Sequence, residues 1–371
     1  MKKIIDLFSG CGGFSTGFQK AGFEVIKAVE FDKQIANSYI QNHKGTKMLA
    51  EDIAKVDNEN YFSKHEADII IGGPPCQGFS MSGLRIRDSS FKEDPRNYLF
   101  KHYLNIVTIV KPDFFVFENV KGILTMNNGK IFNEIIKAFS EKSNFEGTQY
   151  FISFKLVKVV EFGIPQKRER VIIFGSRDIK IDFNTYFEKT FQKFKKENID
   201  FLKPVKVWDA ISNLSEPTET GDIRNSKTKT EYQKSLSSNK PIITNHYKPN
   251  HSEKSIERMK QIKCGENWTS LKEDIKSVHS GSYGRLDKND VAPTIVTRFD
   301  TPSGGKFIHP TENRTITPRE AARIQSFPDD FVFTGTKSSI CRQIGNAVPP
   351  KLAFFLAELI KEIYYDITTK T

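Results

Sequence analysis

The chain is poor in cysteine, and it has no long apolar run. Its four cysteines, at positions 11, 76, 264 and 341, lie far apart in 371 residues and form no Cys-x-x-Cys pair. This spacing predicts neither a zinc site nor a disulfide framework, so no metal is expected. No apolar run approaches the roughly 18 residues of a membrane span, and Asp6 interrupts the first apolar segment before a signal-peptide core could form. We therefore expect a protein of the cytoplasm with no membrane partner.

Acidic residues are also in deficit, since 45 Asp and Glu face 56 Lys and Arg, for a net charge of +11. This excess favours a polyanionic partner such as DNA, although many soluble proteins are basic. Hydrophobic residues make up 37% and charged residues 27%, as in an ordinary soluble protein. A chain of this length holds a full core and is expected to split into two domains.

Strand and helix patterns alternate over residues 1–177, which predicts an α/β fold with a doubly wound, mostly parallel sheet. The predicted strands begin near Lys3, Glu24, Lys47, Asp68, Asp113, Phe154 and Arg170.

The most informative segment is 72–80, Gly-Gly-Pro-Pro-Cys-Gln-Gly-Phe-Ser, which follows a short apolar strand. Prolines stiffen the loop ahead of Cys76, and glycines on both sides let the backbone approach a flat ligand. A lone cysteine is more often a small buried hydrophobe than a nucleophile. The other motifs of the chain decide between these two interpretations.

A glycine turn, Ser9-Gly-Cys-Gly-Gly-Phe14, follows the first strand and opens a helix. Such turns let backbone N–H groups approach a ligand, and an acid at the end of the next strand can bind a ribose. Glu30 fits that position, and Asp52 follows the third strand. Strand-end acids in succession suit a nucleoside, although glycine turns also occur where a strand merely meets a helix.

Two further groups of polar residues lie at strand ends. Glu118 and Asn119 end the apolar strand that contains Phe114–Phe117. Arg168 and Arg170 stand two apart at the start of another strand, so their side chains are expected on the same face. Taken alone, these would be an ordinary strand-end cap and a solvated basic strand end.

Five segments, in order along the chain, resemble the motifs of the DNA cytosine-5 methyltransferases, and in particular those of the prokaryotic restriction-modification type. The segments are 6–14, 73–80, 117–120, 166–170 and 343–350. Amino-group DNA methyltransferases would have an Asp/Asn-Pro-Pro-aromatic loop where this chain has Pro74-Pro75-Cys76. The resemblance implies a Rossmann-like methyltransferase sheet, S-adenosylmethionine as cofactor and S-adenosylhomocysteine as product.

The resemblance also implies catalytic roles. Cys76 would add as a thiolate to carbon 6 of cytosine, and Glu118 would supply or share the proton at N3. Arg170 would hold the cytosine O2. Arg168 would support the catalytic loop or nearby backbone.

For the cofactor, the resemblance implies that Phe8 and Phe31 flank the adenine and Glu30 anchors the ribose. Asp52 and the backbone of Ile53 would read the adenine edge, while Pro75 and Asn346 would close the pocket. The family more often has Trp at the position of Phe31. The residues expected at the cofactor are Phe8, Ser9, Gly10, Gly12, Gly13, Phe14, Glu30, Phe31, Asp52, Ile53, Pro75, Asn346, Ala347 and Val348.

We expect a catalytic and cofactor-binding domain at 1–177, a smaller, loop-rich target-recognition domain at 178–330 and a segment at 331–371 that returns to the first domain. The middle region is rich in Ser, Thr, Asn and Lys and could be a flexible insertion, but four aromatic residues, Trp208, Trp268, Tyr283 and Phe299, give it a core. By resemblance it reads bases in the major groove while the target cytosine is flipped out. Residues expected to contact nucleic acid are Gln77, Ser80, Arg285 and Arg298.

Two helices are predicted beyond this region. Thr317-Pro-Arg-Glu320 has the pattern of a capping box that opens a short supporting helix, with Arg323 expected in a buried ion pair. A helix over 350–364 has Leu352, Leu356, Leu359 and Ile360 on one face, which should pack on the first domain.

The leading hypothesis is an enzyme that methylates carbon 5 of cytosine in a short double-stranded DNA sequence. It would act as a monomer, either alongside a restriction endonuclease that recognises the same site without direct contact or as a solitary or phage enzyme. A tRNA cytosine-5 methyltransferase is a second hypothesis, and a cofactor-binding regulator that holds DNA without turnover is a third. The long middle region argues against the second, and intact Cys76 and Glu118 argue against the third.

Overall fold

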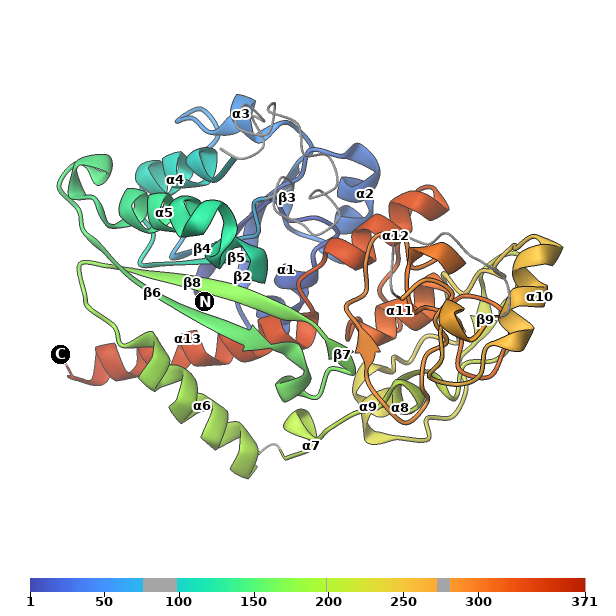
Figure 1. Cartoon of the computed structure of the whole chain (residues 1–371). Coiled ribbons are helices and arrows are strands. Elements are labelled where there is room, and N and C mark those ends of the chain that lie inside the picture. Colours follow the sequence, from blue (N-terminus) through green and yellow to red (C-terminus); the bar gives the residue numbers. More distant parts are fainter. Residues whose placement is uncertain (76–98, 198, 272–280, 371) are drawn as a thin grey trace. The chain divides into compact units, whose positions relative to one another are not determined.

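The computed structural model describes residues 1–75, 99–197, 199–271 and 281–370. The chain forms two compact units, and each is described by itself (Figure 1). The first comprises Met1–Val157, Glu169–Lys193 and Leu352–Thr371, and the second comprises Lys158–Arg168 and Phe194–Lys351. No helix in the described ranges is long and apolar enough to cross a membrane.

The first unit is built on a seven-stranded sheet with the order β3-β2-β1-β4-β5-β8-β6. The strands are β1 (Lys3–Leu7), β2 (Glu24–Val29), β3 (Lys47–Leu49), β4 (Ile69–Gly72), β5 (Phe114–Val120), β6 (Tyr150–Lys158) and β8 (Glu169–Arg177). The strands from β3 to β5 in this order pair in parallel, and β8 pairs antiparallel to β5. The predicted mostly parallel α/β fold is therefore confirmed.

Helices cover both faces of this sheet (Figure 1). The helices of the unit are α1 (Gly13–Lys20), α2 (Lys33–Asn42), α3 (Ile53–Val56), α4 (Leu99–Val110), α5 (Lys130–Ser140), α6 (Phe183–Glu197) and α13 (Pro350–Lys370). On one face, the rings of Tyr103 from α4 and Phe139 from α5 pack against Phe115 and Phe117 of β5. Phe115 and Phe117, which are two residues apart, therefore point to the same face of the sheet, as expected for a strand.

The other face of the sheet carries α6 and α13. Phe114 of β5 contacts Tyr364 of α13, and Phe174 of β8 stacks on Phe183 of α6. The predicted apolar face of α13, which includes Leu352 and Leu356, is buried. Since α6 packs here as far as Lys193, the first unit extends beyond the predicted boundary at 177.

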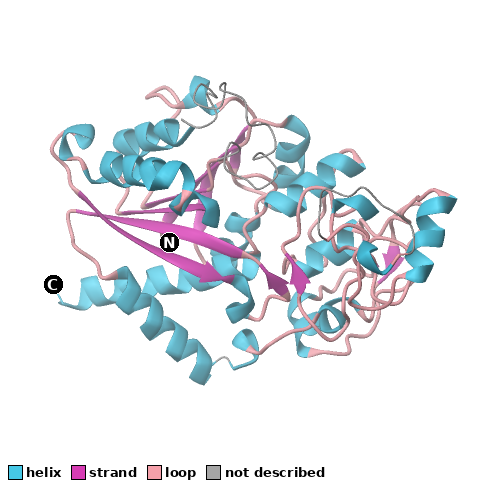
Figure 2. Cartoon of the chain, in the orientation of Figure 1, coloured by secondary structure: helices cyan, strands magenta, loops and turns pink. Residues whose placement is uncertain are grey.

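The described part of the second unit is dominated by loops, as predicted (Figure 2). Each strand described in it spans two residues. Its strands are β7 (Gln166–Lys167), β9 (Ile223–Arg224), β10 (Ile242–Ile243) and β11 (Ala292–Pro293). Its helices are α7 (Ile199–Leu202), α8 (Val207–Ile211), α9 (Glu231–Leu236), α10 (Glu253–Gln261), α11 (Pro318–Ile324) and α12 (Lys337–Asn346). Short 3-10 helices in the chain span Lys121–Leu124, Met126–Gly129, Lys142–Phe145, Val159–Phe162, Trp268–Ser270 and Pro302–Gly304. Part of the core is a cluster of the rings of Phe327, Phe331 and Phe333.

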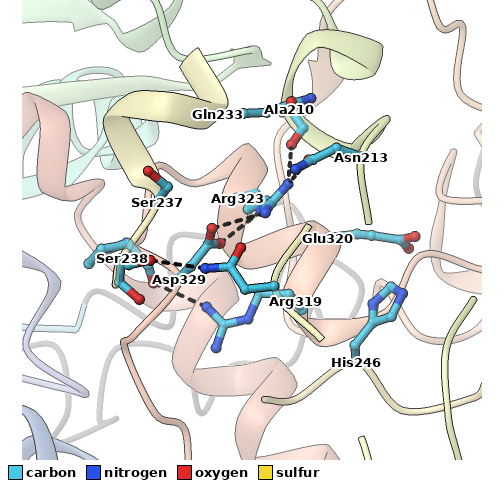
Figure 3. Close-up of polar contacts among 12 residues, drawn as sticks. Ala210, Asn213, Gln233, Ser237, Ser238, His246, Arg319, Glu320, Arg323 and Asp329 are labelled. Atoms are coloured by element: carbon cyan, nitrogen blue, oxygen red, sulfur yellow. Dashed lines mark hydrogen bonds and ion pairs between the residues drawn. The ribbon is translucent and has the colours of Figure 1, made fainter. Parts of the chain in front are cut away.

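Helix α11 is held in this unit by its cap and by a buried ion pair. Thr317 and Glu320 form the predicted capping box. Arg323 pairs with Asp329 at 2.8 Å, and both side chains are fully buried (Figure 3). The guanidinium of Arg323 also donates to the carbonyl of Ala210 and to Oδ1 of Asn213, which join α8 and the loop after it to α11. The predicted capping box and the predicted buried ion pair of Arg323 are thus confirmed.

Candidate active site

The turn between β1 and α1 adopts a backbone conformation that glycine permits. Gly10 has a φ of 56° and Gly12 a φ of 98°, both in the left-handed region. A Cβ on Gly12 would lie 2.1 Å from Nε2 of His43, whereas one on Gly10 would have no described atom within 4 Å. The turn is therefore packed closely at Gly12 and open at Gly10.

Glu30 fixes this turn from the end of the neighbouring strand β2. Its Oε2 accepts a hydrogen bond from the backbone N–H of Gly10 at 3.0 Å, and its Oε1 accepts from Asp32 at 2.8 Å. Burial raises the pKa of Glu30, and the N–H groups that it accepts from oppose that shift. The strand pairing brings Leu7 and Val29 side by side, so the two strand ends meet at one edge of the sheet.

Two aromatic residues lie at the same strand ends. Phe8 follows β1 with a φ of 55°, which is uncommon for a residue other than glycine. Phe31 follows Glu30, and its side chain is 72% exposed. The ring of Phe31 is therefore available to a flat ligand.

A buried chain of hydroxyl groups lies behind the glycine turn. Oγ of Ser15 donates to Oδ2 of Asp6 at 2.6 Å and lies 2.8 Å from the hydroxyl of Tyr39. Oδ1 of Asp6 is buried and has no hydrogen-bond partner among the described residues. Burial raises the pKa of Asp6 to about 7. These contacts could not be predicted from the sequence, because no local pattern relates Asp6 to residues of α1 and α2.

Asp52 begins α3 at the end of the third strand. Its Oδ1 accepts from the N–H of Ala54 at 3.0 Å and so caps the helix. Ile53 is buried, as are Ser9, Gly13 and Phe14 of the glycine turn.

At the end of β5, the carboxylate of Glu118 lies between two groups. Nε of Arg170 is 2.8 Å from its Oε1. Its Oε2 lies 3.1 Å from the place where a Cβ on Gly73 would be, so it lies beside the backbone that enters the cysteine loop. Burial lowers the pKa of Arg170, and the charge of Glu118 opposes this effect. Glu118 and Arg170, two residues to which the resemblance gives roles at the cytosine ring, thus lie together.

Asn119 tethers the same loop. Its Nδ2 donates to the carbonyl of Pro74 at 3.1 Å, while its Oδ1 accepts from the N–H of Val120. The side chain therefore joins β5 to the last residues before Cys76, a role that sequence reasoning did not assign to it. Pro75 is partly buried. Three predicted residues of this loop, Cys76, Gln77 and Ser80, lie outside the described residues.

Arg168 has different partners from Arg170, although the two stand only two residues apart. Its guanidinium is 1% exposed and donates to the carbonyls of Gly345 and Ala347 at 3.0 and 3.1 Å. Between these two carbonyls lies Asn346, which is exposed; Ala347 is partly buried and Val348 buried. Arg168 therefore supports backbone, as predicted, and that backbone is the turn that contains Asn346.

The two arginines predicted to contact bases have different surroundings. Arg298 is exposed, with Nε 4.0 Å from Oδ1 of Asp300. Arg285 is only 5% exposed, and its guanidinium donates to the carbonyls of Met259, Ile262, His309 and Glu312 and to Oδ1 of Asn313. Its donors are thus taken by the protein itself, which corrects its expected role. The sequence reveals that residue 285 is charged. It does not reveal that the surrounding loops bury the side chain.

The family model for C-5 cytosine-specific DNA methylases matches residues 2–362. Among curated proteins, the chain is 34% identical to the type II methyltransferase M1.HphI of Haemophilus parahaemolyticus over 96% of this chain and 86% of that protein. It is 35% identical to the type II methyltransferase M.FnuDI of Fusobacterium nucleatum, over 98% and 95% of the two chains.

Among solved structures, a prophage-encoded DNA modification methyltransferase of E. coli aligns with a TM-score of 0.74 and 28% identity, over 98% of this chain and all of that one. The Dnmt2 methyltransferase of S. pombe shares the fold, with a TM-score of 0.64 at 15% identity over 98% of this chain and all of that one. The match over almost the whole chain agrees with the five ordered motifs and with the positions of Glu118 and Arg170. The chain belongs to the C-5 cytosine-specific DNA methylase family.

Proposed function

We propose that this enzyme transfers a methyl group from S-adenosylmethionine to carbon 5 of a flipped-out cytosine within a specific short double-stranded DNA sequence. The observation that carries the proposal is the position of Glu118, whose two carboxylate oxygens lie beside Arg170 and beside the entrance to the cysteine loop. A proton donor and a cation at a nucleophile's loop are what covalent activation of a pyrimidine needs.

In the proposed reaction, the thiolate of Cys76 forms a bond to carbon 6. The electron pair of the C5–C6 double bond then forms a C4–C5 double bond, and the pair of the C4–N3 double bond moves to N3. Glu118 supplies or shares the proton at N3, which gives a neutral enamine with a nucleophilic carbon 5. Arg170 holds the O2 carbonyl. After carbon 5 has gained the methyl group, N3 returns its proton to Glu118. A base then removes the proton from carbon 5, and the electron pair left behind expels the Cys76 thiolate and restores the C5–C6 double bond.

The residues present fit S-adenosylmethionine, which supplies the methyl group when bound. The turn is open at Gly10, Phe31 offers an exposed ring, and Asp6 has a buried oxygen without a described partner. Glu30 would bind the ribose hydroxyls, Phe8 and Phe31 the adenine faces, and Asp52 with Ile53 the adenine edge. Pro75 and Asn346 to Val348 would complete the pocket.

The proposed DNA contacts are Gln77 and Ser80 of the cysteine loop and the exposed Arg298. The net charge of +11 would add attraction to phosphates that weakens with salt. Since the two curated relatives named above are type II methyltransferases, we propose a restriction-modification role, with a monomeric enzyme and an endonuclease that acts on the same site without direct contact. A solitary or phage-borne enzyme is the variant of this proposal without an endonuclease.

The test is methylation of unmethylated genomic DNA by the purified protein with S-adenosylmethionine, read by base-resolution sequencing of converted cytosines. Protection confined to one short motif would support both activity and target. The Cys76→Ser variant should lose turnover and retain S-adenosylhomocysteine binding. Near-normal methylation by this variant would contradict the covalent mechanism. If wild type binds the cofactor but leaves DNA unmethylated, tRNA is the next substrate to test.

A further inference from the structure

The turn at residues 344–347 is held by buried polar side chains. Arg168 donates to the carbonyls of Gly345 and Ala347 and, at 3.4 Å, to that of Ile295. Since a guanidinium is a rigid planar fork, three carbonyls bound to it are fixed relative to one another. The backbone on both sides of Asn346 is therefore fixed, while its side chain is exposed.

Two glutamines extend this arrangement. Nε2 of Gln166 donates to Oε1 of Gln325 at 2.8 Å, and Nε2 of Gln325 donates to the carbonyl of Ile344 at 2.7 Å. Oε1 of Gln166 accepts from the N–H of Ile295 at 2.8 Å. Both side chains are fully buried. Because each amide has its carbonyl and its amino end occupied, the bonds run in one direction, and neither amide can flip without loss of two of them.

The turn is also in direct contact with the segment at 295–297. A Cβ on Gly345 would lie 2.6 Å from the carbonyl carbon of Val296 and 2.8 Å from the N–H nitrogen of Thr297. The two backbones therefore touch, and glycine is required at this position. Neither segment can shift alone, because Arg168 binds both of them. Gln166 binds Ile295 directly and reaches the turn only through Gln325.

We infer that Gln166, Arg168 and Gln325 are positioning residues that hold the turn at 344–347 in the conformation that binds the cofactor. The inference rests on the proposed function, in which Asn346, Ala347 and Val348 line the pocket for S-adenosylmethionine. The three side chains act through the backbone of the turn and not by contact with the reacting atoms. Apolar side chains of similar size would fill the same space but would leave the buried carbonyls without donors, and the turn would lose its fixed conformation.

The test compares two buried arginines of the same unit. Arg168→Lys removes the fork that binds the turn. Arg319→Lys is the matched control, because Arg319 is also fully buried and donates to three carbonyls, those of Thr244, Pro328 and Phe331, none of which belongs to the turn. The measurements are the dissociation constant of S-adenosylhomocysteine by calorimetry and the melting temperature without ligand.

Both variants should melt at a lower temperature than wild type. Arg168→Lys should weaken S-adenosylhomocysteine binding by about tenfold or more, whereas Arg319→Lys should stay within about twofold of wild type. Equal weakening in both variants would assign the effect to stability alone and overturn the inference. So would a dissociation constant of Arg168→Lys close to that of wild type.

If Arg168→Lys fails to fold, Gln325→Leu gives the second measurement, because it removes the bonds to Gln166 and Ile344 and keeps a similar volume. Weakened binding of S-adenosylhomocysteine supports the inference, and unchanged binding overturns it. If wild type itself does not bind S-adenosylhomocysteine, the proposed cofactor is wrong and the inference fails with it. The wild-type measurement thus distinguishes an error in the proposed cofactor from an error in the role given to the three positioning residues.

Discussion

Nε of Arg170, in the first residues of β8, lies 2.8 Å from Oε1 of Glu118 near the end of β5. Antiparallel pairing brings these two ends together, since Val120 is the register partner of Arg170. Both side chains are largely buried. A carboxylate and a guanidinium that share so little water interact strongly, and loss of either leaves a buried charge.

Glu118→Gln should slow methyl transfer by about a hundredfold or more, because glutamine keeps the shape but cannot supply a proton. The measurement is single-turnover transfer to DNA with saturating S-adenosylmethionine. Glu169→Gln is the control, since Glu169 pairs with Lys121 near the surface, and its rate should match wild type. A Glu118→Gln rate within about twofold of wild type would show that the proton comes from elsewhere.

Asn119→Ala should lower the single-turnover rate by about tenfold, because the loop before Cys76 loses its tether and its geometry is less well defined. Binding of S-adenosylhomocysteine should change little. Asn144→Ala serves as control, since Nδ2 of Asn144 also donates to a backbone carbonyl, that of Ala138. Both residues belong to the same unit but are far in sequence from the cysteine loop. If both variants transfer the methyl group at the wild-type rate, Pro74 keeps its position without the hydrogen bond from Asn119.

The sequence was sufficient to predict the central sheet, because its buried strands are short continuous apolar runs. Predicted and observed strand starts agree within one residue except at β6, which begins at Tyr150 and not near Phe154. This strand is at the edge of the sheet, and most of its side chains are partly exposed. Its sequence therefore lacks the buried apolar run that marked β4 and β5.

Long-range polar contacts could not be predicted from the sequence. Gln166 and Gln325 are separated by 159 residues, and no local pattern relates them. Arg285 was predicted to contact bases because it is a cation near a predicted strand of the recognition region. In the structure, however, five protein oxygens accept hydrogen bonds from its guanidinium. In contrast, the capping box at Thr317 and the ion pair of Arg323 were predictable, because the box is local and a charged residue in a buried helix requires a partner.

Asp329→Asn should destabilise the protein by about 3–5 kcal/mol, because it leaves the charge of Arg323 buried without its partner. Urea unfolding, followed by the fluorescence of Trp208 and Trp268 in the same unit, measures this loss. The double variant Arg323→Met, Asp329→Leu removes both charges and should recover part of the stability. A single variant as stable as wild type would show that the pair is not shielded from water.

Asp6→Asn should change the pH dependence of stability. The pKa of Asp6 is raised by burial from 3.8 to about 7 in the folded protein. Between these values the folded protein holds a proton that the unfolded chain has released. The stabilising contribution of this group is therefore complete below about pH 3.8 and is lost as the pH rises through 7.

Asparagine does not titrate and can still accept the hydrogen bond from Ser15. The free energy of unfolding of Asp6→Asn, relative to wild type, should therefore rise between pH 5 and pH 8 by at most about 3 kcal/mol. His43, whose pKa burial lowers to about 4, titrates in both proteins and cancels in the difference. A difference that is constant from pH 5 to pH 8 would mean that Asp6 is ionised throughout this range, and that its unpartnered oxygen is hydrated or paired in solution.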